Sequence, residues 1–266
     1  MKKFDILNSL DLGNAIAEYD KNIANYYIDT QATMDIVSDR CDIIKGTKGS
    51  GKTAMLVALC NNQSNYSELD GKLLIKAISL KGDPDFKRAF SMVRVNDKDI
   101  QKLIEAWKIY IINIIWKEYS NLFSDGKELM DYLCKKKLLS SKKTIIGLLL
   151  HALHCVKLRA SNTYNVDGTT TQSFELMPNL GEETTNSLSV ELVDYNYIFN
   201  ELDTLITKNR SCFWIMIDRL DDAFPDKTQE NTLVLKALFY AYKDLCMYEG
   251  FKIKIFIRDD IYKEIT

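Results

Sequence analysis

The chain has 266 residues, of which 46% are apolar and 27% are charged, as is typical of a globular protein with a buried core. Its formal net charge of −2 excludes the strongly basic proteins that bind nucleic acid through overall charge, although 35 Lys and Arg residues leave room for a local basic face. The length fits one large α/β domain, which we place over residues 1–266.

We predict a cytoplasmic protein without membrane contacts. The first residues, Met1-Lys2-Lys3, are followed by Asp5 and Asp11 and not by the apolar segment of a secretory signal. The longest apolar runs, 109–116 and 145–150, are too short to span a bilayer. The 6 cysteines are scattered without a C-x-x-C pair, so we expect thiols and neither disulfides nor a zinc site.

The first elements along the chain are predicted to be helical. Apolar residues recur at helical spacing over 14–28, which indicates an amphipathic helix. Thr30 is placed to cap a second, short helix that ends at Val37. Both segments precede the first predicted strand, 41–44.

Residues 46–53 are the most informative segment. They follow the strand 41–44 and precede a helical segment, 54–59, so the order is strand, glycine-rich loop and helix. The segment reads G-T-K-G-S-G-K-T, which matches the P-loop that binds nucleotide phosphates. Its glycines allow a tight turn with backbone N–H groups aimed at an anion, and the helix dipole adds positive potential. The predicted nucleotide-binding residues are Gly46, Thr47, Lys48, Gly49, Ser50, Gly51, Lys52 and Thr53.

Two residues of this loop have distinct predicted roles. Lys52 supplies a full positive charge to the β- and γ-phosphates, and the Thr53 hydroxyl is a ligand of Mg²⁺. We therefore predict ATP and Mg²⁺ as the bound cofactors.

The middle of the chain is predicted to be a helical insertion, 97–190, within the single domain. A second strand, 73–80, precedes it. The clearest helix signal in the chain covers 99–123; a shorter helix follows, and another is expected over 145–158. Residues 160–188 are rich in Ser, Thr, Asn and Gly, which favours a long surface segment that contains a hairpin.

A second motif follows a predicted helix over 193–208. The run 212–217 is apolar without alternation, as expected for a central parallel strand that is buried on both faces. Asp218 follows directly, at the edge where α/β sheets bind ligands, and we predict that it holds Mg²⁺. Asp221 and Asp222 are the candidates for the group that activates water; the alternative is that they cap the next helix.

A third motif ends the chain. A helix over 231–248, closed by Gly250, leads into a strand over 252–257 that ends at Arg258. A guanidinium at this strand tip can contact the γ-phosphate, and the alternative is a surface salt bridge with Asp259 or Asp260. The predicted catalytic residues are thus Lys52, Asp218, Asp221, Asp222 and Arg258.

The three motifs together resemble those of bacterial P-loop ATPases related to the STAND and AAA+ groups. The resemblance covers roughly 10–80 and 195–266, and it implies a three-layer α/β sandwich with a mainly parallel sheet of strand order 5-1-4-3-2. The sequence ends 8 residues after Arg258, so we expect the fifth strand and the helical lid of such ATPases to be missing. In many such enzymes the segment before the first strand covers the adenine ring, which is the alternative to a core position for Tyr26 or Tyr27.

The resemblance implies an ATPase that acts as a switch or in assembly, slow in isolation, with a second copy of the chain or another protein as partner. Several relatives of this kind belong to anti-phage defence systems, so defence is the expected setting. One departure is Arg219, since many AAA+-type enzymes have Glu directly after the Mg²⁺ ligand. This favours, as a second interpretation, an interaction module that binds nucleotide without hydrolysis; a small-molecule kinase is the third.

Overall fold

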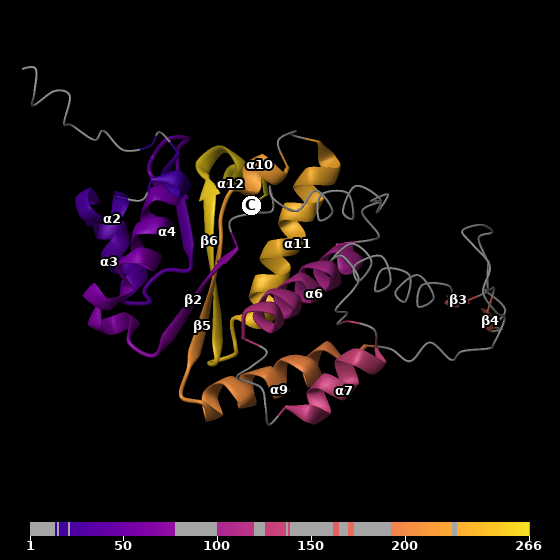
Figure 1. The fold of residues 1–266 in the computed structure, drawn as a ribbon. Coiled ribbons are helices and arrows are strands. Elements are labelled where there is room, and N and C mark those ends of the chain that lie inside the picture. Colours follow the sequence, from indigo (N-terminus) through magenta and orange to yellow (C-terminus); the bar gives the residue numbers. More distant parts are fainter. Residues whose placement is uncertain are drawn as a thin grey trace, which may run out of the picture.

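The centre of the molecule is a four-stranded sheet in which every strand runs parallel to its neighbours (Figure 1). The computed structural model of the chain describes residues 14, 16–20, 22–77, 100–119, 126–136, 138, 162–164, 170–172, 193–224 and 228–265. The four strands are β1 (Ile43–Gly46), β2 (Lys72–Ala77), β5 (Cys212–Ile217) and β6 (Phe251–Arg258). Their order across the sheet is β1-β6-β5-β2.

This order agrees with the prediction. Counted along the chain, the four strands lie in the order 1-4-3-2, and a fifth strand beside β1 is not found among the described residues. The prediction that 212–217 forms a central strand is confirmed, because β5 lies between β6 and β2 and its last five residues are buried. Alternate side chains of β5 enter two separate apolar clusters, one on each face of the sheet.

One face is covered by α3 (Gln31–Val37) and α4 (Lys52–Asn61), shown in indigo and violet in Figure 1. Leu56 and Leu59 of α4 pack with Trp214 and Met216 of β5 in the smaller cluster. Thr30 caps α3 as predicted, since its side chain accepts a hydrogen bond from the backbone N–H of Thr33. Two short 3-10 turns, Gln63–Asn65 and Ser67–Leu69, connect α4 to β2.

The opposite face carries the larger apolar cluster, so helices flank the sheet on both sides. It is formed with α6 (Ile100–Tyr119), α7 (Lys127–Lys135), α9 (Tyr195–Lys208) and α11 (Gln229–Leu245). The indole N–H of buried Trp107 in α6 donates to the carbonyl of Val234 in α11, at 2.9 Å. The described helices of the predicted insertion therefore pack into the core of the sheet. The division of the chain at 97 and 190 stays a prediction.

The long N-terminal helix predicted over 14–28 is wrong. The structure has a 3-10 turn, Ala17–Tyr19, and a separate four-residue helix, α2 (Ile23–Tyr26). Between them lies Asp20, which is 6% exposed and whose carboxylate accepts hydrogen bonds from the backbone N–H groups of Asn14 and Asn22. A carboxylate that binds nearby backbone donors competes with helix formation, and helical spacing of apolar residues does not reveal this.

Elsewhere the elements follow the prediction with shifted ends. The expected hairpin is present as β3 (Asn162–Tyr164) paired antiparallel with β4 (Thr170–Gln172). The helix predicted over 231–248 ends at Leu245, so Gly250 does not close it. The predicted helix 145–158 and the residues 78–80 and 120–123 lie outside the described residues. Among the helices that are described, none is long and apolar enough to cross a membrane.

Candidate functional site

The candidate site lies at the carboxyl ends of the strands. Because all four strands are parallel, these ends meet at one edge of the sheet. Gly46 at the end of β1 pairs with Arg258 at the end of β6, and Ile217 at the end of β5 pairs with Ile255 of β6. The sheet thus brings the glycine loop, Asp218 and Arg258 to the same edge, although each comes from a different motif.

The loop that follows β1 turns through two glycines with positive φ. Gly49 and Gly51 have φ angles of 82° and 84°, in the left-handed region that glycine adopts most readily. Gly51 is also the N-cap of α4, and it has no side chain with which to cap the helix. The first N–H groups of α4 therefore have no side-chain cap from this position, and the helix dipole favours an anion there.

Lys52 is the first residue of α4, and its side chain reaches back to the loop. Its Nζ donates hydrogen bonds to the carbonyl oxygens of Gly46 at 3.0 Å and Thr47 at 2.9 Å, and Ser50 Oγ lies at 3.4 Å. A Cβ atom added to Gly46 would lie 2.5 Å from Ser50 Oγ, so a larger residue here would displace the Ser50 hydroxyl. The ammonium group is thus held at the base of the turn by groups of the loop.

Thr53 and Asp218 form the contact that joins the first two motifs. The Thr53 hydroxyl donates to Asp218 Oδ2 at 2.6 Å, across 165 residues of sequence. Asp218 is 3% exposed, and burial raises its pKa, although the Thr53 hydrogen bond, the backbone N–H of Arg219 and the charges of Arg219 and Lys52 act in the opposite direction. A hydroxyl beside a buried carboxylate suits Mg²⁺, which takes few protein ligands and keeps several waters.

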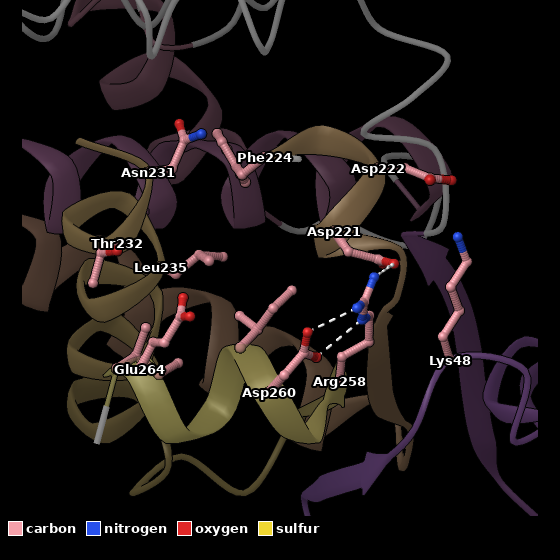
Figure 2. A pocket seen from close by; sticks show the side chains of 12 residues that line it. Lys48, Asp221, Asp222, Phe224, Asn231, Thr232, Leu235, Arg258, Asp260 and Glu264 are labelled. Carbon is pink, nitrogen blue, oxygen red and sulfur yellow. Dashed lines mark hydrogen bonds and ion pairs between the residues drawn. The ribbon is translucent and has the colours of Figure 1, made fainter. Parts of the chain in front are cut away.

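Arg258 forms ion pairs with two carboxylates, as Figure 2 shows. Its Nε and Nη2 donate to the two oxygens of Asp260 at 3.0 and 2.7 Å, and its Nη1 donates to Asp221 Oδ2 at 3.3 Å. These hydrogen bonds hold the pKa of Asp260 below its ordinary value. The salt-bridge interpretation of Arg258 is therefore confirmed for Asp260, at the beginning of α12 (Asp259–Ile265). Contact with a γ-phosphate stays a prediction.

The interpretation of Asp221 and Asp222 as helix caps is wrong. The helix that follows β5 is α10 (Leu220–Ala223), and its N-cap is Arg219, which makes no side-chain cap hydrogen bond. Arg219 has a φ of 59°, so the chain turns sharply after Asp218, and both carboxylates fall inside the first turn of α10. Arg219 Nη1 forms an ion pair with Asp222 Oδ2 at 3.2 Å.

The glycine loop, Asp218, Asp221, Asp222 and Arg258 line a common cavity of about 440 Å³. Of the predicted site residues, all except Gly46 and Thr47 line it. Ile16, Ala17 and Ala54 also line the cavity and were not predicted from the sequence; Arg219, which departs from the motif, lines it as well. Ile16 and Ala17 precede the first strand, and only the fold of the N-terminal segment brings them to the loop.

The two tyrosines before β1 do not line this cavity. The Tyr27 hydroxyl is within hydrogen-bond distance of Thr33 Oγ1, at 2.9 Å, and its ring packs against the cluster beneath α3 and α4. Tyr26 is 51% exposed. The core interpretation therefore fits Tyr27, and neither tyrosine is placed to cover a base in this structure.

A second cavity, of about 220 Å³, adjoins the first (Figure 2). Both are lined by Lys48, Asp221, Asp222 and Arg258, so these four residues form the boundary between them. The remaining wall of the second cavity comes from Phe224, which follows α10, and from α11 and α12, with Asn231, Leu235 and Ile261 among its residues. Within the described ranges, no group of three or more His, Cys, Asp and Glu side chains is arranged to hold a metal ion.

The chain was also compared with known proteins. No model of a protein family, no curated protein and no solved structure matched it.

Proposed function

We propose that this chain has the P-loop NTPase fold, binds ATP with Mg²⁺ at the cavity of about 440 Å³, and hydrolyses ATP. The observation that carries the proposal is the 2.6 Å contact between Thr53 and Asp218. It places the two predicted Mg²⁺ ligands together, beside a glycine loop that begins a helix. Neither residue alone would indicate a nucleotide, but the combination is what a Mg²⁺-nucleotide requires.

The phosphates would bind at the turn between Gly46 and α4. The N–H groups at the start of α4 would donate to phosphate oxygens, and Lys52 would exchange the carbonyls of Gly46 and Thr47 for the β- and γ-phosphates. Phosphate oxygens are anionic and accept charge-assisted hydrogen bonds, which are stronger than those to neutral carbonyls.

Thr53 and Asp218 would hold Mg²⁺, whose charge neutralises the negative charge that develops on the phosphates. The chain's own contribution is to keep a carboxylate buried and close to the loop. Because burial raises the pKa of Asp218, a nearby divalent cation would favour the charged form that burial disfavours.

Asp221 and Asp222 are the proposed groups for orienting the attacking water. Both line the cavity next to the loop, and each is paired with an arginine in this structure, Asp221 with Arg258 and Asp222 with Arg219. A γ-phosphate that attracts Arg258 would weaken its pairing with Asp221 and free that carboxylate to accept a hydrogen bond from water. The same movement of Arg258 would change its ion pair with Asp260 in the first turn of α12. Nucleotide binding would in this way alter the position of α12.

The cellular role that we propose is that of a switch or assembly ATPase, and it is supported only by the motif resemblance. The same holds for a partner, either a second copy or another protein, and for a place in anti-phage defence. Turnover that rises faster than linearly with protein concentration would support a site that copies of the chain share.

The proposal is tested by measuring ATP binding and turnover in Mg²⁺ for the wild type, for Lys52→Ala and for the exposed control Lys243→Ala on α11. We expect Lys52→Ala to weaken ATP binding about 100-fold, from the loss of charge-assisted hydrogen bonds, and to abolish turnover. The control should match the wild type. The proposal would be refuted if the wild type bound no nucleotide.

Two other functions are favoured by specific observations. Both candidate bases are tied to arginines, which favours an interaction module that binds ATP without turnover. The second cavity, next to the proposed γ-phosphate position, could hold an acceptor molecule, which favours a small-molecule kinase. Tight binding without phosphate release would support the module, and phosphate release without an added acceptor would argue against the kinase.

A further inference from the structure

The loop carries two lysines, and their surroundings differ. Lys52 is held by two carbonyl oxygens of the loop. Lys48 is exposed at the tip of the loop, and it has no hydrogen-bond or ion-pair partner among the residues that the structure describes. The ammonium group of Lys52 is therefore held by the loop itself, whereas that of Lys48 is not paired with any residue that the structure describes.

Lys48 lies at the boundary of the two cavities. Figure 2 shows it rising from the loop opposite the wall that carries Asp221, Asp222 and Arg258, with its ammonium group toward the Asp222 side. Lys48 also lines the larger cavity together with the residues that begin α4, Lys52 and Thr53. A phosphate chain whose inner groups bind at α4 would extend its outermost group toward that boundary.

The other cations that line the larger cavity already have partners. Arg219 is paired with Asp222, and Arg258 with Asp260 and Asp221. An ATP molecule remains an anion after it binds Mg²⁺, so it needs further positive charge. Lys48 can supply this charge without breaking an existing ion pair, because its stem is flexible and its ammonium group is compact.

We propose that Lys48 binds the terminal phosphate of the nucleotide from the outer side of the loop, opposite Lys52, and so determines the preference for triphosphate over diphosphate. This inference rests on the proposed nucleotide site. It gives the chain, within one copy, a cation at the terminal phosphate, where charge accumulates during hydrolysis.

The test compares Lys48→Met and Lys48→Arg with the control Lys263→Met, by titrating each folded protein with ATP and separately with ADP in Mg²⁺. Lys263 is an exposed lysine of α12 that does not line either cavity. We expect Lys48→Met to weaken ATP binding about 10- to 100-fold and ADP binding less than about twofold. Lys48→Arg should retain most of the preference for ATP over ADP, and the control Lys263→Met should retain all of it.

The outcomes separate this inference from the proposed function. If the wild type binds ATP and Lys52→Ala abolishes binding, but Lys48→Met leaves the ratio of ATP to ADP affinity unchanged, the role of Lys48 is overturned and the site stands. Equal losses for ATP and ADP would also overturn it, because they would place Lys48 at an inner phosphate. A wild type that binds neither nucleotide would overturn both. Unfolding midpoints of the variants would show that the losses are not due to misfolding.

Discussion

The two ends of the central sheet both bury charged groups, but only one end neutralises them. At the amino end of β1, Lys254 from the middle of β6 is 0% exposed, and its Nζ donates to Asp39 Oδ1 at 2.5 Å, to Asp42 Oδ1 at 2.6 Å and to the carbonyl of Cys41 at 3.0 Å. Lys252 adds a second ion pair with Asp39. At the carboxyl end, Asp218 is buried, and its hydrogen-bond donors among the described residues are the Thr53 hydroxyl and the backbone N–H of Arg219.

The pKa values of two carboxyl groups express this difference. Burial raises the pKa of both. At Asp39 the hydrogen bonds and charges of Lys252 and Lys254 outweigh burial, so the pKa falls below its ordinary value. At Asp218 burial outweighs the opposing effects, so the pKa is raised. The charged form of the carboxyl group is thus favoured at Asp39 and disfavoured at Asp218, where a bound cation would favour it.

The largest expected effect comes from removing the buried cation of the amino end. Lys254→Met leaves the carboxylates of Asp39 and Asp42 without their shared partner and removes an ammonium that lies 4.3 Å from the centre of the Trp214 ring. We expect a loss of about 2–4 kcal/mol in the free energy of unfolding, below the full cost of breaking a buried pair because both carboxylates are partly exposed. Denaturant unfolding followed by circular dichroism measures it.

The control for that variant is Lys252→Met, since the Lys252 side chain is 37% exposed. It should cost less than about 1 kcal/mol, as expected for an ion pair near the surface. Equal losses of unfolding free energy in Lys254→Met and Lys252→Met would show that the burial of Lys254 does not affect stability. That result would contradict the comparison between the two ends of the sheet.

An opposite sign is expected at the carboxyl end. Asp218→Asn removes a buried charge and keeps an oxygen to accept the Thr53 hydroxyl, so we expect it to stabilise the ligand-free protein by about 1 kcal/mol at neutral pH, while Mg²⁺-dependent ATP binding is lost. Because the raised pKa disfavours the charged form, the gain should appear as the pH rises through the folded pKa and vanish below the ordinary value of 3.8.

Asp39→Asn is the matched control for Asp218→Asn. Its lowered pKa means that the charged form contributes stability above the ordinary value of 3.8, and that this stability is lost as the pH falls through the folded pKa. The Asn variant should therefore be less stable than the wild type at neutral pH, with a smaller difference in acid. Unfolding curves between acid and neutral pH test both signs, and the same sign for both variants would contradict the comparison.

The last comparison concerns two glycines that both have a positive φ, one at each end of the sheet. Gly51 has a φ of 84° and Gly71, before β2, has a φ of 74°; a Cβ atom would be free of close contacts at either position. Each change to Ala should cost about 1 kcal/mol of stability through backbone strain. Only Gly51→Ala should also weaken ATP binding, which a titration of both variants would check. Equal binding losses would mean that the loop has no special role.

Much of the site could be predicted from the sequence because its parts are local. The strand, loop and helix around Gly46–Thr53 depend on glycine positions and apolar runs that are close in sequence. The uninterrupted apolar run of β5 predicted its central place and the position of Asp218. Thr30 as a helix cap and the hairpin within 160–188 followed from short patterns of the same kind.

Only the tertiary structure decided how these parts meet. Three features of the site join residues from different elements. They are the contact between Thr53 and Asp218, the pairing of Arg258 with Asp221, and the position of Ile16 and Ala17 in the cavity wall. The same is true of Lys254, which occurs in an alternating K-I-K-I strand that gives no sign of complete burial. The sequence by itself determined the strand, loop and helix of the proposed phosphate site and which strand lies at the centre. The packing decided which charges are neutralised, because a charge's partners come from whichever elements the fold places beside it.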